Sequence, residues 1–476
     1  MASAAIDYSD VQGTILRGYR VDLARHFVLS VTRPAAAKAF LAALVDGAGG
    51  LPSITTAERW TKESKPECFV NVAFTSAGLA ALGLPAAQLA TFDAAFQRGA
   101  TAPASAAAVG DQGESAPANW IGGLANGTRV HVLLSLWVTD DPAVLEAVSA
   151  RLRAAFAGGL SELSAHDAHA LPDNKVHFGY RDSIAQPTVK GAPPRKHPIP
   201  DDQDPVETGE FLLGYKNQSG GRYQVQPTEL STNSSYAAFR ILEQDVVGFE
   251  SFLEAYAAPG KIDPEMLAAK VCGRWRNGNP LVLEPDAPGQ PLPLEQLNDF
   301  TYVNGSDPTK DDTLGLRCPI GSHIRRNNPR NEEIIGSDSA HHRIIRRAMP
   351  YGPEYDPAHP VAVPRGLVGY FINGSLTNQF EFLSSQWNLL SDFVKSAYGP
   401  GGFDAGNAHF NISGQDLFLG VNDPASSSFT LAALGKKGSN NTLLKGFSRY
   451  ITTRGGAYCF FPSITGLRYL AALPGA

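Results

Sequence analysis

A carboxylate in a short loop is the first group in this chain with catalytic potential. Asp182 lies in "KVHFGYRDSIAQPTV" (Lys175–Val189), between Gly179 and Pro187. Glycine and proline mark the ends of loops, and an aspartate in a turn commonly accepts hydrogen bonds from nearby amides. The alternative is that Asp182 is an acid/base group that a stiff loop holds over a cofactor. The loop alone does not decide between these interpretations.

Two basic segments later in the chain add further candidates. His323 lies in "LRCPIGSHIRRNNPR" (Leu316–Arg330), where neighbouring cations favour a neutral imidazole, the state that binds a metal. Taken singly, His323 is better explained as a structural histidine. The segment "HHRIIRRAMPYGPEY" (His341–Tyr355) concentrates arginines before a Pro-Tyr-Gly turn, and a solvated basic face is the simplest interpretation of it.

These segments, in this order, resemble the dye-decolorizing peroxidases, a haem family built from two ferredoxin-like halves. The resemblance runs nearly end to end. It rests on an opening segment "DYSDVQGTILRGY", a G-x-x-D-G-like signature "GYRDSIAQP", a proximal-histidine segment "HIRRNNPR", a distal-arginine segment "RRAMPYG" and a closing strand "TRGGAYCFFPSI" (Thr453–Ile464). Any one of these motifs is weak, but the set is specific.

The resemblance implies a role for individual residues. His323 would ligate the iron of one haem b per chain, Asp182 would be the distal acid/base, and Arg346 would stabilise charge beside it. Arg346 is chosen over Arg347 because it is the first arginine of "RRAMPYG". Leu367 and Phe371 are expected as further haem contacts.

Two points stay open within this resemblance. For the hydrogen-bond partner of His323, the helix-like segment "LTNQFEFLSSQWNLLSDFV" offers Glu381 and Asp392, and the sequence does not choose between them. Ser183 replaces the second glycine of the signature, and Ala457 stands where an acidic residue is common. The serine would tighten the loop or add a hydroxyl to the distal pocket, which puts peroxide access in question.

The implied activity is oxidation of dyes, phenols and other aromatic reductants by hydrogen peroxide, one electron at a time. Bulky dyes cannot enter a pocket built for peroxide, so surface tyrosines or tryptophans would relay electrons, and the sequence cannot rank them. Two other hypotheses remain: a haem-binding protein without efficient turnover, and a haem-free member of the same architecture. An absorption spectrum and the response of a haem to peroxide separate the three.

Composition excludes several classes of partner. The 476 residues carry 40 basic and 46 acidic side chains, a net charge of −6, and no basic run long enough to follow a phosphate backbone, so nucleic acid is not expected. The longest uncharged apolar stretches, such as "VLLSLWV" (Val132–Val138), are far shorter than the roughly 18 residues that span a bilayer. No membrane partner is expected, and the chain is predicted to be a monomer or homodimer.

Cysteines and glycosylation sequons bear on the compartment. The 4 cysteines lie far apart without a C-x-x-C pair, which predicts buried thiols. No signal peptide is visible, so the cytoplasm is the default expectation. The alternative is secretion with the signal removed, because N-x-S/T sequons stand at Asn126, Asn217, Asn233, Asn304, Asn373, Asn411 and Asn440.

The elements that must position these residues form an alpha+beta pattern. Strand-like runs at 68–75, 129–138, 209–215, 234–242 and 366–374 alternate with helix-like segments, among them "DPAVLEAVSARLRAAF" and "EQDVVGFESFLEAYA". The prolines between Pro187 and Pro205 predict an extended connection. We expect two ferredoxin-like halves with antiparallel sheets: residues 1–215, which end in the Asp182 loop and this connection, and residues 216–476, which carry His323 and Arg346.

Overall fold

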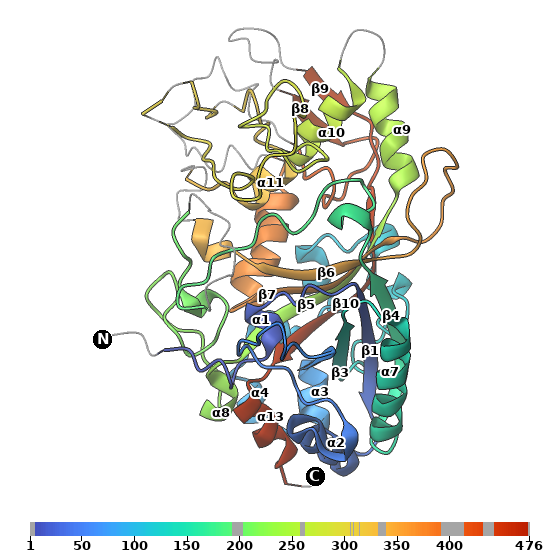
Figure 1. Ribbon diagram of the computed structural model, residues 1–476, viewed down its shortest axis with the longest axis vertical. Coiled ribbons are helices and arrows are strands. Elements are labelled where there is room, and N and C mark those ends of the chain that lie inside the picture. Colours follow the sequence, from blue (N-terminus) through green and yellow to red (C-terminus); the bar gives the residue numbers. More distant parts are fainter. Residues whose placement is uncertain are drawn as a thin grey trace.

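The computed structural model describes residues 5–192, 203–257, 262–304, 306–307, 309–313, 315–331, 339–391, 414–431 and 442–474. Its central feature is an antiparallel sheet in the order β4-β1-β3-β2-β10-β5-β7-β6, with helices packed around it (Figure 1). The α+β class predicted from the sequence is confirmed.

The first half of the sheet is formed by β1 (Leu23–Val31), β2 (Cys68–Phe74), β3 (Val132–Val138) and β4 (Leu160–His169). Two long helices connect these strands, α2 (Pro34–Asp46) after β1 and α7 (Pro142–Phe156) after β3. Both helices begin with a proline in the first turn, and the Asp141 side chain caps α7 by accepting from the Ala143 amide. Strand β3 is buried along its whole length, as its uncharged and largely apolar sequence predicts.

The second half repeats this arrangement with β5 (Ser235–Gln244), β6 (Ile345–Tyr351), β7 (Gly366–Asn373) and β10 (Ile451–Phe461). In both halves the fourth strand lies beside the first, followed by the third and the second. The halves meet where β2 pairs with β10 at Phe74 and Phe460. Strands β4 and β6, at the two ends of the order, also lie against each other, so the sheet curls into a barrel.

Helices and short strands of the second half form a separate lobe, seen at the upper end of Figure 1. It contains α9 (Val246–Tyr256), α10 (Pro264–Cys272), α11 (His323–Asn327), and the hairpin of β8 (Ser428–Leu431) and β9 (Thr442–Lys445). Phe178, Phe249, Phe252 and Phe418 belong to the apolar core of this lobe. Since Phe178 precedes Asp182 by four residues, the lobe anchors the start of the Asp182 loop.

The remaining elements are short or cover the outside of the barrel. The α-helices among them are α1 (Gly13–Leu16), α3 (Ser76–Ala81), α4 (Ala86–Leu89), α5 (Ala94–Arg98), α6 (Pro103–Ala108), α8 (Thr228–Ser231) and α13 (Ile464–Ala471). The single turns are η1 (Ala48–Gly50), η2 (Gly113–Ser115), η3 (Pro117–Asn119), η4 (Pro172–Asn174), η5 (Thr208–Glu210) and η6 (Ser339–His342), and η7 (Leu376–Glu381) and η8 (Leu383–Asn388) are π-helical. No helix in the described ranges is long and apolar enough to cross a membrane. The cysteines are free thiols; Cys272, Cys318 and Cys459 are buried, as predicted, whereas Cys68 is only partly buried.

Two sequence predictions differ from the observed elements. The run Gly209–Tyr215 is a 3-10 turn followed by further turns and not a strand, although Phe211, Leu212 and Leu213 are fully buried. The predicted helix after Ser375 is present but π-helical. Strand β4 ends at His169 and β5 begins at Ser235, and the exact boundary at residues 215 and 216 stays a prediction. Residues 193–202 of the proline-rich connection lie outside the described chain.

Candidate active site

A large cavity opens between the second half of the sheet and the lobe above it. It encloses about 1280 Å³ of empty space, its open mouth included. Strands β5, β6, β7 and β10 contribute Arg240, Leu242, Arg346, Phe371, Ile451 and Thr453, while α11, η7 and η8 contribute His323, Ile324, Asn327, Phe380, Leu383, Ser384 and Asn388. The cavity is of a size that accommodates a large organic cofactor.

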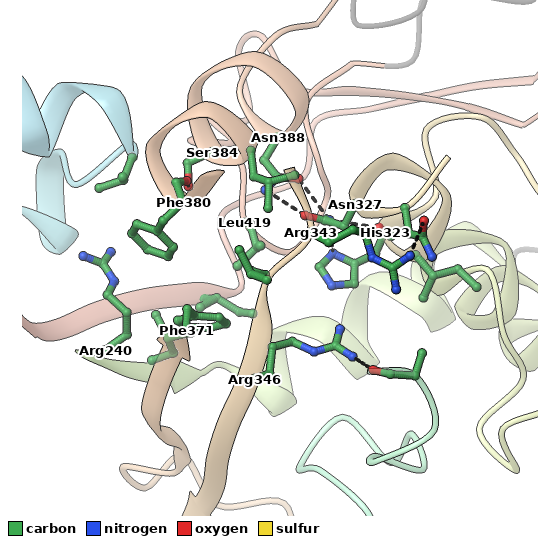
Figure 2. Close-up of a pocket in the computed structure, with 18 of the residues that line it drawn as sticks. Arg240, His323, Asn327, Arg343, Arg346, Phe371, Phe380, Ser384, Asn388 and Leu419 are labelled. Atoms are coloured by element: carbon green, nitrogen blue, oxygen red, sulfur yellow. Dashed lines mark hydrogen bonds between the residues drawn. The ribbon is translucent and has the colours of Figure 1, made fainter. Parts of the chain in front are cut away.

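His323 enters this cavity from the first turn of α11 (Figure 2). Its Nδ1 lies 2.9 Å from Oδ2 of Asp416, which is fully buried. The other oxygen of Asp416 accepts from the amides of Phe418 and Leu419 at 2.9 and 2.8 Å. Since a carboxylate accepts only, Nδ1 carries the proton and the lone pair of Nε2 is available for a metal.

Neighbouring amides hold the histidine and its helix in place. Asn327 donates to the His323 carbonyl at 2.9 Å and to Oδ1 of Asn388 at 3.1 Å, and Asn388 donates back to Asn327 at 3.2 Å. The Phe418 ring packs edge-on against the imidazole, with centroids 5.6 Å apart. This bracing ties α11 to η8 and fixes the direction of the imidazole.

The sequence offers Glu381 and Asp392 as partners of His323, and Glu381 is wrong. The Glu381 carboxylate accepts instead from Arg98 at 2.8 Å and from the Tyr458 hydroxyl at 3.0 Å. Asp392 lies outside the described residues. Asp416, the partner that the structure reveals, is 93 residues from His323 in sequence, and no motif in "SGQDLFLG" marks it.

The two adjacent arginines of β6 point to opposite faces. Arg346 lines the cavity and donates to the carbonyl of Ala185, whereas Arg347 donates to the carbonyls of Thr14 at 2.8 Å and Arg17 at 3.1 Å, at the end of α1. Burial lowers the pKa of Arg346, and the negative charge of Asp182 opposes that shift. The structure therefore brings Arg346, and not Arg347, together with His323.

The Asp182 loop approaches the same side of the cavity through Ala185 and Pro187, which line it. Gln186 fixes the loop to β6, because its side-chain amide accepts from the Arg346 amide and donates to the Arg346 carbonyl, both at 3.0 Å. Asp182 itself is exposed and is not among the lining residues. Its amide donates to the Asn174 carbonyl at 2.7 Å, which closes the turn that precedes the loop. Its carboxylate lies near enough to Arg346 to act on the charge of the guanidinium.

Ser183 adopts a left-handed backbone conformation, with φ at +61°. Glycine adopts this conformation without steric cost, whereas a side chain at Cβ is strained there. The serine therefore keeps the turn that the signature glycine would make, and its side chain is exposed. Phe371 lines the cavity, while Leu367 lies on the same face of β7 four residues earlier and is not among the lining residues. That either residue contacts a haem stays a prediction.

The arginine content of the cavity was not anticipated from the sequence. Among the described residues that line it there are no carboxylates, and the arginines are Arg240, Arg274, Arg330, Arg343, Arg346 and Arg449. Asp111 neutralises Arg240 through two hydrogen bonds of 2.7 and 2.6 Å. Arg343 is buried and donates to Gln203 at 2.6 Å, and Arg449 donates to the Gly110 carbonyl, also at 2.6 Å. The lining therefore favours a ligand that carries negative charge.

Comparison with known proteins identifies the family. The family model "DyP dimeric alpha+beta barrel domain" matches residues 10–172. A dye-decolorizing peroxidase of Mycena epipterygia is 31% identical to this chain, over 98% of the chain and 88% of the relative. The chain belongs to the dye-decolorizing peroxidase family. It is accordingly a peroxidase, an oxidoreductase that reduces peroxide, as the resemblance predicted.

Solved structures of dye-decolorizing peroxidases share the fold over almost the whole chain. One, described as a complex with 2,6-dimethoxyphenol, is 26% identical and superposes with a TM-score of 0.80, covering 98% of this chain and 100% of its own. Another, described as an engineered heme pocket for asymmetric sulfoxidation, is 25% identical with a TM-score of 0.79 and the same coverage. The two ferredoxin-like halves are thus the fold of the family.

Proposed function

We propose that this chain is a haem b peroxidase that uses hydrogen peroxide to oxidise dyes, phenols and other aromatic reductants in one-electron steps. The observation that carries the proposal is the His323–Asp416 pair, which faces the same cavity as Arg346 and the Asp182 loop. The relative crystallised with 2,6-dimethoxyphenol supports a phenolic reductant for this chain. The relatives named for dye decolorization support dyes.

The cavity residues fit a haem. The Nε2 atom of His323 would ligate the iron, since Asp416 holds the proton on Nδ1. Phe371, Phe380 and Leu419 offer apolar contacts, and Leu367 extends the same face of β7. A haem b carries two carboxylates, and the arginine-rich lining without carboxylates suits them.

Each polar residue has a separate task in the proposed reaction. A bound haem would supply the iron and the electrons that split the O–O bond of peroxide. Asp182 takes a proton from one peroxide oxygen and returns it to the other, the leaving oxygen. Arg346 stabilises the negative charge that develops there without reorganising, because its guanidinium is already held by the Ala185 carbonyl. Asp416 makes His323 a stronger electron donor through the shared hydrogen bond.

The proposal is tested by the absorption spectrum of the purified protein and its change on adding peroxide. A Soret band followed by a rapid spectral change is expected. Absence of haem would favour a haem-free member of the fold, and haem without a response would favour a haem-binding protein without turnover. His323→Ala is expected to abolish stable haem incorporation. A variant that retains one equivalent of histidine-ligated, five-coordinate haem would refute the assignment of the iron ligand.

A further inference from the structure

A tyrosine, a glutamate and an arginine form a hydrogen-bonded cluster behind the cavity, apart from the residues assigned above. The Tyr458 hydroxyl on β10 donates to Oε1 of Glu381 at 3.0 Å, and Arg98 donates to Oε2 at 2.8 Å. Tyr458 is 2% exposed, whereas the Arg98 side chain is 36% exposed. The cluster thus connects a buried phenol to the surface through one carboxylate.

Tyr458 lies one layer of side chains from the cavity. Its ring packs edge-on against Phe380, with centroids 6.1 Å apart, and Phe380 lines the cavity. Figure 2 shows Phe380 and Arg240 together on one side of the pocket. Arg240 acts electrostatically on Tyr458 and also lines the cavity. A cofactor in the cavity would therefore be separated from this phenol by Phe380 and Arg240.

The carboxylate makes Tyr458 chemically different from other buried tyrosines. Burial, and next the negative charge of Glu381, raise the pKa of Tyr458 well above its ordinary value. The phenol is therefore neutral and can lose an electron readily only if its proton leaves as well. Glu381 is an acceptor at hydrogen-bond distance. By contrast, the hydroxyls of Tyr19, Tyr180 and Tyr370 are bonded to an amide oxygen, a backbone carbonyl and a serine hydroxyl.

We propose that Tyr458 is an internal one-electron donor to the peroxide-oxidised haem, with Glu381 as the base that takes its proton. The O–H bond of the phenol breaks, the proton forms a new O–H bond on Oε1 of Glu381, and one electron reduces the haem by one equivalent. A neutral tyrosyl radical and a protonated Glu381 result. Return of one electron from an external reductant and of the proton from Glu381 restores the resting cluster. This inference rests on the proposed haem peroxidase activity.

The position of Tyr458 determines what such a radical would do. Dyes cannot touch a side chain that is 2% exposed, so Tyr458 would store an oxidising equivalent inside the protein. Protonation of Glu381 removes its charge beside Arg98, and the part-exposed guanidinium remains solvated. Storage would keep the oxidising equivalent available until a slow reductant reacts, because it would not be lost to nearby side chains.

The test is electron paramagnetic resonance on the haem-loaded protein, frozen at intervals after mixing with hydrogen peroxide and no reductant. A protein radical is expected whose spectrum narrows when the protein is produced with ring-deuterated tyrosine. Tyr458→Phe is expected to lose this signal. Tyr370→Phe is the matched control, because Tyr370 is equally buried but bonds to Ser135, and it should retain the signal. Glu381→Gln keeps an acceptor oxygen but not the base, and should slow formation of the radical by about 10²-fold.

The outcomes separate this inference from the proposed function. An unchanged tyrosyl signal in Tyr458→Phe, or loss of the signal in Tyr370→Phe alone, overturns the role of Tyr458. Absence of any tyrosyl signal in a wild-type protein whose haem spectrum responds to peroxide overturns the inference and leaves the peroxidase intact. If Tyr458→Phe does not fold, Glu381→Gln decides, since a wild-type rate of radical formation in that variant also overturns it. No haem, or no response to peroxide, would instead refute the proposed function.

Discussion

Replacing Asp416 by asparagine tests the assignment of the iron ligand through the proton on His323. Oδ1 of Asp416 accepts from two backbone amides and Oδ2 faces Nδ1 of His323. An asparagine has one acceptor oxygen and one NH2 group. If the oxygen faced the imidazole, the NH2 group would face two amide donors and leave both unpaired, at about 1–3 kcal/mol each.

The opposite orientation of the asparagine is therefore favoured, and it moves a proton. The oxygen keeps the two amides, and the NH2 group donates to Nδ1 of His323, which forces the proton onto Nε2. Because Nε2 would bind the iron, haem affinity should fall by about 10- to 100-fold, the usual effect of losing a partner of a metal-ligating histidine. This corresponds to about 1.4–2.8 kcal/mol.

The assay is titration of the apoprotein with haem, followed by the Soret band, with thermal unfolding measured in parallel. Asp423→Asn is the control, because Asp423 is exposed on the same segment and caps the Ala425 amide at 2.8 Å. It should bind haem like the wild type. Wild-type affinity in Asp416→Asn would refute the reasoning, because a histidine bonded to an NH2 group could not then be the ligand through Nε2.

Three further predictions concern Arg346, Asp182 and Ser183. Arg346→Leu should bind haem but react with peroxide about 10²-fold more slowly than the wild type. Its control, Arg347→Leu, should lower the unfolding temperature and keep the wild-type peroxide rate. Equal peroxide rates in the two variants would contradict the assignment of Arg346. Asp182→Asn should react with peroxide about 10²-fold more slowly than the wild type in stopped-flow measurements, because an amide cannot accept the proton from peroxide. A wild-type rate in this variant would make Asp182 a loop residue only. Ser183→Gly should raise the free energy of unfolding by about 1 kcal/mol, because glycine adopts the left-handed conformation without strain. Its control, Ser426→Gly, at an exposed turn without positive φ, should lower the free energy of unfolding by about 0.5–1 kcal/mol. A change of the same sign in both variants would exclude backbone strain as the cause.

The sequence predicted those elements in which the spacing of the apolar residues fits either a helix or a strand, but not both. Strands β2, β3, β5 and β7 and helices α7 and α9 were all anticipated from apolar periodicity. The run Gly209–Tyr215 was misassigned because its apolar residues are buried by packing while the backbone turns. For example, the Leu213 amide donates to the Ser234 carbonyl at 2.9 Å and the Gly214 amide to the Tyr223 carbonyl at 2.9 Å. Periodicity reports burial, and a short buried turn has the same signature as a strand.

The site was predictable only where a motif carried it. His323 and Arg346 stand in recognisable segments, and strand alternation requires that one of two adjacent arginines face the cavity. Which face holds the cavity depends on the lobe packed above the sheet, so strand alternation alone could not decide, and the choice of Arg346 came from the resemblance. Asp416 could not be predicted, since its contact with His323 joins two segments 93 residues apart. Glu381 was a reasonable candidate by type, but its segment directs it toward Tyr458.

The pairing of Gln186 with Arg346 also bears on how the barrel closes. Strand β6 ends the order of the sheet and lies against β4, but within the described residues no ladder joins the two strands. At this seam the Gln186 side chain accepts from the amide of Arg346 and donates to its carbonyl, so the Asp182 loop takes the place of a neighbouring strand. Loss of this contact would free the Asp182 loop and leave both backbone groups at the seam without these partners, so loss of activity and opening of the barrel should begin at the same place.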